Sequence, residues 1–181
     1  MPNEHWRYFL ALEEDVERTT RFVEPHQANY RTFSIEFARL LLSTCSEIEV
    51  VAKVLCEAIA PGAQAENMDH YRSTIGSRYP KLHTVNVRVH RFGLAMEPWK
   101  EWGNGQNPGW WRDHQKVKHS RHLHYALADL EHCVVAAAAL YSLALYLCHD
   151  ELIGLEPSRF FSVGLPPGGV MQKVWLPDFA S

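Results

Sequence analysis

The stretch CVVAAAALYSLALYLC, residues 133–148, decides the fold of this chain because it is the longest apolar run. None of its side chains is charged. A membrane span needs about 20 apolar residues, so this run is too short to cross a bilayer comfortably. We therefore expect a helix that is buried inside a domain. Its four consecutive alanines, Ala136–Ala139, favour a close contact with a neighbouring helix or subunit.

A second long helix is predicted from about Ser34 to Ala60. Its apolar residues recur at the three- and four-residue spacing of one helix face: Phe37, Leu41, Ile48, Val51, Val54 and Leu55. Pro61-Gly62 then ends the pattern. A shorter amphipathic helix is predicted at residues 4–22, and another near residues 68–75.

The segment after residue 84 changes to the two-residue period of a strand. Valine alternates there with polar residues, at Val85, Val87 and Val89. This strand, Thr84 to His90, either offers an edge for dimerisation or covers the helices. Residues 99–109 are dense in turn formers and predict a loop. Near the end of the chain, Pro166-Pro167-Gly168-Gly169 predicts a hairpin or an extended arm.

Length and composition fit one cytoplasmic domain. The chain has 181 residues, 46% of them hydrophobic, which is enough for one substantial core. We expect a single mainly helical domain over residues 1–181. Its parts are core helices at about 33–60 and 110–149, an insertion at 62–109 and a C-terminal arm at 151–181. The first residues lack the order of a signal peptide, and the four cysteines form no C-x-x-C pair. No membrane attachment is expected.

The most informative stretch for function is WWRDHQKVKHSR, residues 110–121. Six of its side chains can carry a positive charge, although the whole chain has a net charge of -3: Arg112, His114, Lys116, Lys118, His119 and Arg121. Local cations beside aromatic rings suit a phosphate ester and the base attached to it. Trp110, Trp111 and Gln115 would then contact the substrate. The alternative is a solvated helix face behind two core tryptophans.

These residue types can also support RNA cleavage without a metal or another cofactor. Histidine moves protons near neutral pH, and His119 is the candidate here. Arg112, Lys118 and Arg121 would supply fixed donors for the charge of a phosphoryl transition state. On a helix Arg112 and His119 lie about 20° from the same face.

A resemblance follows from these residues. Trp110-Trp111, Val117-Lys118-His119 and Arg121, followed by the long Ala/Leu-rich helix, resemble the second half of a HEPN domain (higher eukaryotes and prokaryotes nucleotide-binding). The segment FSIEFARLLLSTCSEIEVVAKVLCEAI resembles the first core helix of bacterial HEPN-like proteins. Together the two cover residues 33–60 and 110–148, under half of the chain. The resemblance implies an antiparallel helical bundle that forms a homodimer. It also implies a metal-independent endoribonuclease of a defence or toxin–antitoxin system, with an antitoxin or regulatory partner.

The family signature, an Arg followed after four to six residues by a His, places the His at His119. Arg112 fits the widest spacing, whereas the commoner spacing places His114 where the Arg is expected. In that second alignment His114 and His119 form an acid/base pair that meets one substrate only across a dimer interface. In a HEPN-like bundle the first core helix packs on the motif helix. Glu47 or Glu36 would therefore orient His119 or Arg121, unless both are plain surface acids.

Two alternatives of other classes stay open. The first is a non-catalytic HEPN-like module that binds a nucleotide, RNA or a partner protein. The second is a metal-dependent helical-bundle enzyme, suggested by the eleven histidines. However, the chain has no H-E-x-x-H and no E-x-x-H motif. His122-x-His124 and Asp129-x-x-His132 each lack a partner set, so no metal site is expected.

Overall fold

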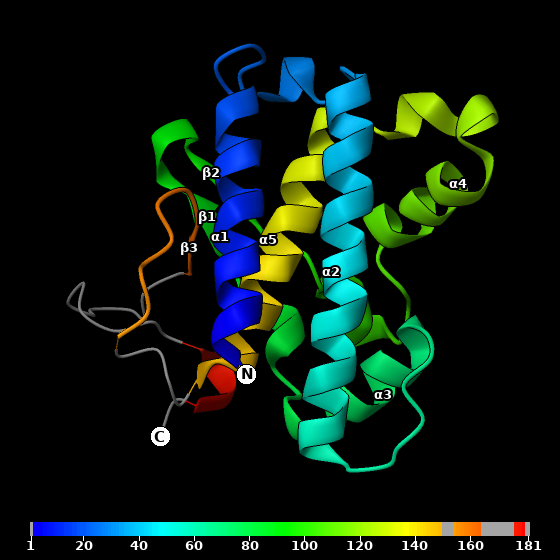
Figure 1. Cartoon of the computed structure of the whole chain (residues 1–181), viewed down its shortest axis with the longest axis vertical. Helices are drawn as coiled ribbons and strands as arrows, with labels where there is room; N and C mark the ends of the chain where they lie inside the picture. Colours follow the sequence, from blue (N-terminus) through cyan, green and yellow to red (C-terminus); the bar gives the residue numbers. More distant parts are fainter. Residues whose placement is uncertain (1, 150–153, 164–175, 180–181) are drawn as a thin grey trace.

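The apolar run forms the central helix of a mainly helical structure (Figure 1). The computed structural model describes residues 2–149, 154–163 and 176–179. Helix α5 (Leu130–Leu147) buries all four of its consecutive alanines. Within the described residues it is the one helix long and apolar enough to cross a membrane, and 83% of it is buried inside the structure. The predicted fold class, mainly helical with a small β element, is confirmed.

Helices α1 (Pro2–Thr19) and α2 (Ile35–Ile59) pack on α5. Ser34 caps the start of α2 by accepting a hydrogen bond from the Phe37 amide. The amide of Leu130 donates to the carbonyl of Thr32, so α2 and α5 begin side by side and run in the same direction. In Figure 1, α1 runs antiparallel to both. The parallel pair is possible because the 70 or so residues between α2 and α5 return the chain to the same end.

The helix predicted over residues 110–149, for which a kink was one option, is broken into two separate helices. The segment forms two helices, α4 (Gly109–His124) and α5, joined by a 3₁₀ turn. Ser120 has non-helical backbone angles, φ −146° and ψ 50°, and bends the last turn of α4. Asp129 then starts α5, because its carboxylate accepts a hydrogen bond from the His132 amide at 3.0 Å. An N-cap between apolar neighbours leaves no gap in the hydrophobic pattern.

The insertion contains α3 (Met68–Arg78), which confirms the short predicted helix, and two of the three strands of a small antiparallel sheet. Its strands are β1 (Val87–Val89), β2 (Leu94–Met96) and β3 (Ser162–Val163). The valines at 85, 87 and 89 are all buried, as their alternation predicts. However, β1 pairs with β2 on one side and β3 on the other, so its use as a free edge for dimerisation is wrong.

The C-terminal part of the chain returns to the helices. Ser158 to Phe161 lie against α1, where they bind the buried carboxylate of Glu13. Asp178 accepts hydrogen bonds from the Lys81 amide at 2.9 Å and the Tyr146 hydroxyl at 2.8 Å. The hairpin or arm predicted at residues 166–169 lies outside the described residues.

Candidate functional site

Helix α4, which carries the predicted site residues, lies at the side of the bundle and packs against α2 and α5 (Figure 1). Its buried face consists of residues at three- and four-residue spacing: Trp110, Trp111, His114 and Val117. Arg112, Lys116 and His119 are exposed, and the 100° step of a helix places them on the outward side. Gln115 is half-buried between the two faces. The inward side of α4 therefore builds the core, and its cations face solvent.

The predicted substrate-binding tryptophans are core residues. Trp110 and Trp111 are 5% and 6% exposed. The Trp110 indole donates to the carbonyl of Pro98 at 2.8 Å, and its ring contacts Trp99 and Trp111 edge to face. Trp99 and Trp102 are buried as well. This packing leaves neither ring of the Trp110-Trp111 pair open to stack a base, in contrast to the sequence-based expectation.

His114 is a buried neutral histidine. It is 2% exposed, its ring lies 4.9 Å from that of Trp111, and its Nδ1 has no hydrogen-bond partner within the described residues. Burial, together with the charges of Lys118 and His119, lowers the pKa of His114 to about 4. The predicted acid/base pair of His114 and His119 is therefore not formed, because His114 cannot reach a substrate in solvent.

Replacing His114 with leucine is expected to stabilise the protein. The change removes a buried polar atom without a partner, which is worth about 1 kcal/mol at neutral pH. The gain is expected to grow to about 4 kcal/mol at about pH 4, because the lowered folded-state pKa makes wild type lose about 3 kcal/mol of stability as pH falls from 6.5. Urea unfolding at several pH values measures both effects. His122→Leu, an exposed control on the same helix, should leave the pH profile unchanged; a destabilised His114→Leu protein would contradict this account.

The exposed cations of α4 divide into paired and unpaired groups. Lys116 binds Asp113 at 2.7 Å, and Lys118 lies 3.7 Å from Glu49 of α2. Within the described residues, Arg112 and Arg121 form no hydrogen bond or ion pair, and neither does the ring of His119. The helix holds four lysine and arginine side chains against one aspartate. It is therefore locally cationic in a chain of net charge -3.

Neither acid that was expected to orient His119 does so. Glu47 is held by His5 of α1, with 2.8 Å between His5 Nδ1 and the carboxylate. Glu36 binds Arg39, which also reaches Asp15 of α1. Glu47 therefore joins α2 to α1, and Glu36 forms its ion pair within α2. Neither of these contacts includes α4. The acid of α2 that does approach α4 is Glu49, through Lys118.

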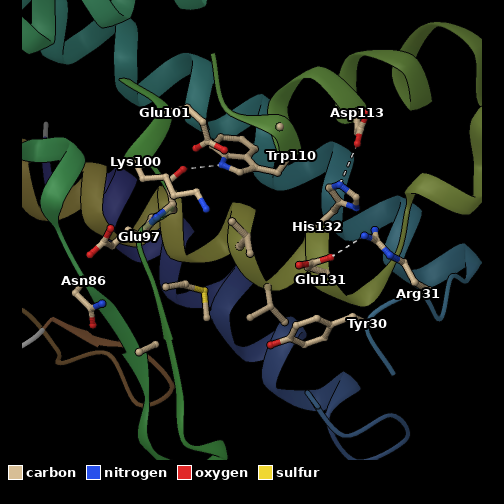
Figure 2. A pocket seen from close by; sticks show the side chains of 16 residues that line it. Tyr30, Arg31, Asn86, Glu97, Lys100, Glu101, Trp110, Asp113, Glu131 and His132 are labelled. Atoms are coloured by element: carbon tan, nitrogen blue, oxygen red, sulfur yellow. Dashed lines mark hydrogen bonds and ion pairs between the residues drawn. The ribbon is translucent and has the colours of Figure 1, made fainter. Parts of the chain in front are cut away.

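A second cluster connects α4, α5 and the segment before α2, and it was not predicted. His132 is 8% exposed and lies between two carboxylates, 2.6 Å from Asp129 and 3.2 Å from Asp113. Figure 2 shows the contact with Asp113. Arg31 binds the other oxygen of Asp129 at 3.1 Å and Glu131 at 3.4 Å. Charges of opposite sign thus alternate along one chain of contacts, in the order Lys116, Asp113, His132, Asp129, Arg31, Glu131. We call this set the ion chain.

Four members of the ion chain, Arg31, Asp113, Glu131 and His132, form one wall of a cavity of about 640 Å³. Glu97, Lys100 and Glu101 form the opposite wall, with Trp110 and Val135 among the apolar lining residues (Figure 2). On the wall formed by the ion chain, Asp113 pairs with His132 and Glu131 pairs with Arg31, and no serine or cysteine is among the described lining residues. Among the described residues, no group of three or more His, Cys, Asp or Glu side chains could hold a metal ion.

Comparisons with protein-family models, curated proteins and solved structures gave no match.

Proposed function

We propose that the outward face of α4 binds the phosphate backbone of RNA. The observation that carries the proposal is a set of exposed α4 side chains that have no carboxylate partner within the described residues. Arg112 and His119 lie on the outward side of the helix, and Arg121 follows the bend at Ser120, with Lys118 beside His119 in the sequence. Unpaired arginines bind phosphate oxygens through a fixed fork of donors, and binding releases the counterions of the nucleic acid. A patch of three to four cations corresponds to weak binding at physiological salt.

The proposed contact is with phosphates rather than with bases. Base recognition in single strands depends on aromatic rings that are free to stack. Trp110 and Trp111 are buried in the core, and their packing supports a role in placing α4 instead. We therefore expect little sequence preference.

Under this proposal the protein is a HEPN-like module. We favour RNA binding without catalysis over nuclease activity as its function. His114 is buried and Glu47 is held by His5, so two of the proposed catalytic groups are committed elsewhere. The homodimer, the cytoplasmic location and an antitoxin or regulatory partner belong to the same proposal. They rest on the resemblance of residues 33–60 and 110–148 to the HEPN superfamily.

Cleavage is the second candidate, and the exposure of His119 beside Lys118 supports it. In this function His119 would accept the proton of the RNA 2′-hydroxyl, whose oxygen attacks the neighbouring phosphorus and displaces the 5′-oxygen. Arg112 and Arg121 would bind the charged phosphate.

The test compares RNA binding by wild type and by the Arg112→Gln/Arg121→Gln double variant. We expect the double variant to bind a fluorescent single-stranded RNA at least about tenfold more weakly, because two phosphate contacts are lost. Fluorescence anisotropy at low salt measures the affinity. The matched control is Arg7→Gln/Arg21→Gln, which removes the same charge from exposed residues of α1 and the turn beyond it. In Figure 1, α1 and α4 lie on opposite sides of α2.

The same samples decide between binding and cleavage. Intact RNA after long incubation with wild type supports the binding module. RNA fragments that form with wild type and not with His119→Ala would establish the nuclease instead. Equal affinity of the double variant and its control would contradict the proposed α4 surface.

A further inference from the structure

His132 lies between two carboxylates, and this geometry fixes its protonation state. Its Nδ1 is 2.6 Å from Asp129, and its Nε2 is 3.2 Å from Asp113. A carboxylate only accepts hydrogen bonds, and neutral imidazole has one N–H. The imidazolium form donates its hydrogen bond to Asp129 and also carries the positive charge that forms the ion pair with Asp113. The contacts therefore select positively charged His132.

The charged His132 joins two helices that otherwise share few charged contacts. Asp129 is at the start of α5, directly before it, whereas Asp113 is in the first half of α4. Asp113 also binds Lys116 at 2.7 Å, so the link continues along the outward side of α4. Because Ser120 interrupts the helix further on, the part of α4 that carries Arg112 and His119 is held by its buried face and by this link.

Other charged groups face the same region from each neighbouring element. The segment before α2 contributes Arg31 and the hydroxyl of Tyr30, and α5 contributes Glu131. The strand β2 and the turn beyond it place further charges across the cavity, at Glu97, Lys100 and Glu101. Acids outnumber bases around His132, so its surroundings favour the positive form.

We propose that His132 is a positioning residue that, as imidazolium, holds α4 through Asp113 and makes the α4 surface dependent on pH. The inference rests on the proposed function for the role of α4 in RNA binding, but the positioning itself does not. Deprotonation of His132 removes its positive charge, so the ion pair with Asp113 is lost, whereas neutral imidazole can keep its hydrogen bond to Asp129. Asp113 is the partner that can turn to solvent, because Asp129 is buried and Asp113 is partly exposed.

The pKa of His132 sets the direction of the pH effect. Burial alone would lower the pKa of His132, but the hydrogen bond to Asp129 and the charges of Asp129, Asp113 and Glu131 raise it above its ordinary value. A raised pKa in the folded state means that the link is complete below the ordinary histidine range. The link is then lost as pH rises through the folded-state pKa.

Hydrogen exchange of residues 109–119 tests the positioning role without RNA. Each protein is measured from about pH 6 to about pH 9, with rates corrected for the intrinsic exchange of the unfolded peptide. We expect wild-type α4 to lose protection as pH rises, by about fivefold, and His132→Gln and Asp113→Asn to be less protected and independent of pH. His122→Gln, an exposed histidine of the same helix, should behave as wild type. Equal pH profiles in wild type and Asp113→Asn would overturn the inference, even if His132→Gln fails to fold.

RNA affinity in a His119→Gln background separates this inference from the proposed function. That background removes the one histidine that the proposed function places on the binding surface. Affinity that falls with rising pH there, but not in the same background with Asp113→Asn, supports the inference. RNA bound equally at all pH values by both proteins would overturn the coupling while leaving the proposed function intact. Absence of RNA binding at any pH, with the exchange result as expected, would instead remove the proposed function.

Discussion

Replacing Asp129 with alanine is expected to lower the free energy of unfolding by about 4 kcal/mol, from loss of the N-cap of α5 and of a buried ion pair. Asp129 is 1% exposed, and its two oxygens serve the His132 amide, the His132 ring and Arg31. Without the carboxylate, three donors lose their acceptor, one of them on a buried charged ring. Urea unfolding followed by circular dichroism near neutral pH measures the loss.

Two control variants separate the roles of Asp129. Asp129→Asn keeps an oxygen for the cap but removes the charge. We therefore expect it to lower the free energy of unfolding by about half as much as Asp129→Ala does. Arg31→Gln removes a partner that is 75% exposed, and an exposed ion pair is worth less than about 1 kcal/mol. A loss below about 1 kcal/mol in Asp129→Ala would contradict the ion chain as a stabilising feature.

Replacing Glu13 with alanine is expected to cost about 3 kcal/mol, because buried donors would lose their only carboxylate. Glu13 is 3% exposed on α1 and accepts hydrogen bonds from the amides of Arg159, Phe160 and Phe161, each at 3.2 Å. The hydroxyl of Ser158 donates to it as well. The carboxylate therefore attaches the segment that leads into β3 to the helical bundle.

The effect of Glu13→Ala should be local as well as global. We expect faster hydrogen exchange at residues 158–163 and faster proteolysis of that segment, with α2 and α5 less affected. Glu14→Ala is the matched control, because Glu14 is exposed and, within the part of the chain that the structure describes, binds only Arg18, at 3.1 Å. If Glu13→Ala and Glu14→Ala unfold at the same urea concentration, the anchoring role of Glu13 is wrong.

The helical framework was predictable because it depends on local patterns. The apolar run of α5, the helical spacing of α2 and the alternating valines of β1 each show in a few consecutive residues. The break at Asp129 was missed because its cap lies between apolar residues. Glu13 was missed for a related reason, since an acid on an amphipathic helix is normally solvated.

The site was predictable only in part. The exposure of Arg112 and His119 follows from helix geometry, as does the burial of the other face. Trp110, Trp111, His114 and Val117 share one buried stripe, a spacing that could have assigned His114 to the core. By contrast, the ion chain joins segments about 100 residues apart, as Arg31 and Asp129 show. No local pattern in the sequence relates such residues.

The salt dependence of RNA affinity tests the proposed α4 surface most directly. For single strands the slope of log affinity against log salt is about −0.7 per neutralised phosphate, so three to four contacts predict a slope of about −2 to −3. Removing Arg112 and Arg121 together is predicted to make the slope shallower by about 1.4, whereas removing Arg7 and Arg21 should leave it unchanged. Equal slopes for the two double variants, or no RNA binding by wild type at low salt, would contradict the assignment of α4 as the RNA-binding surface.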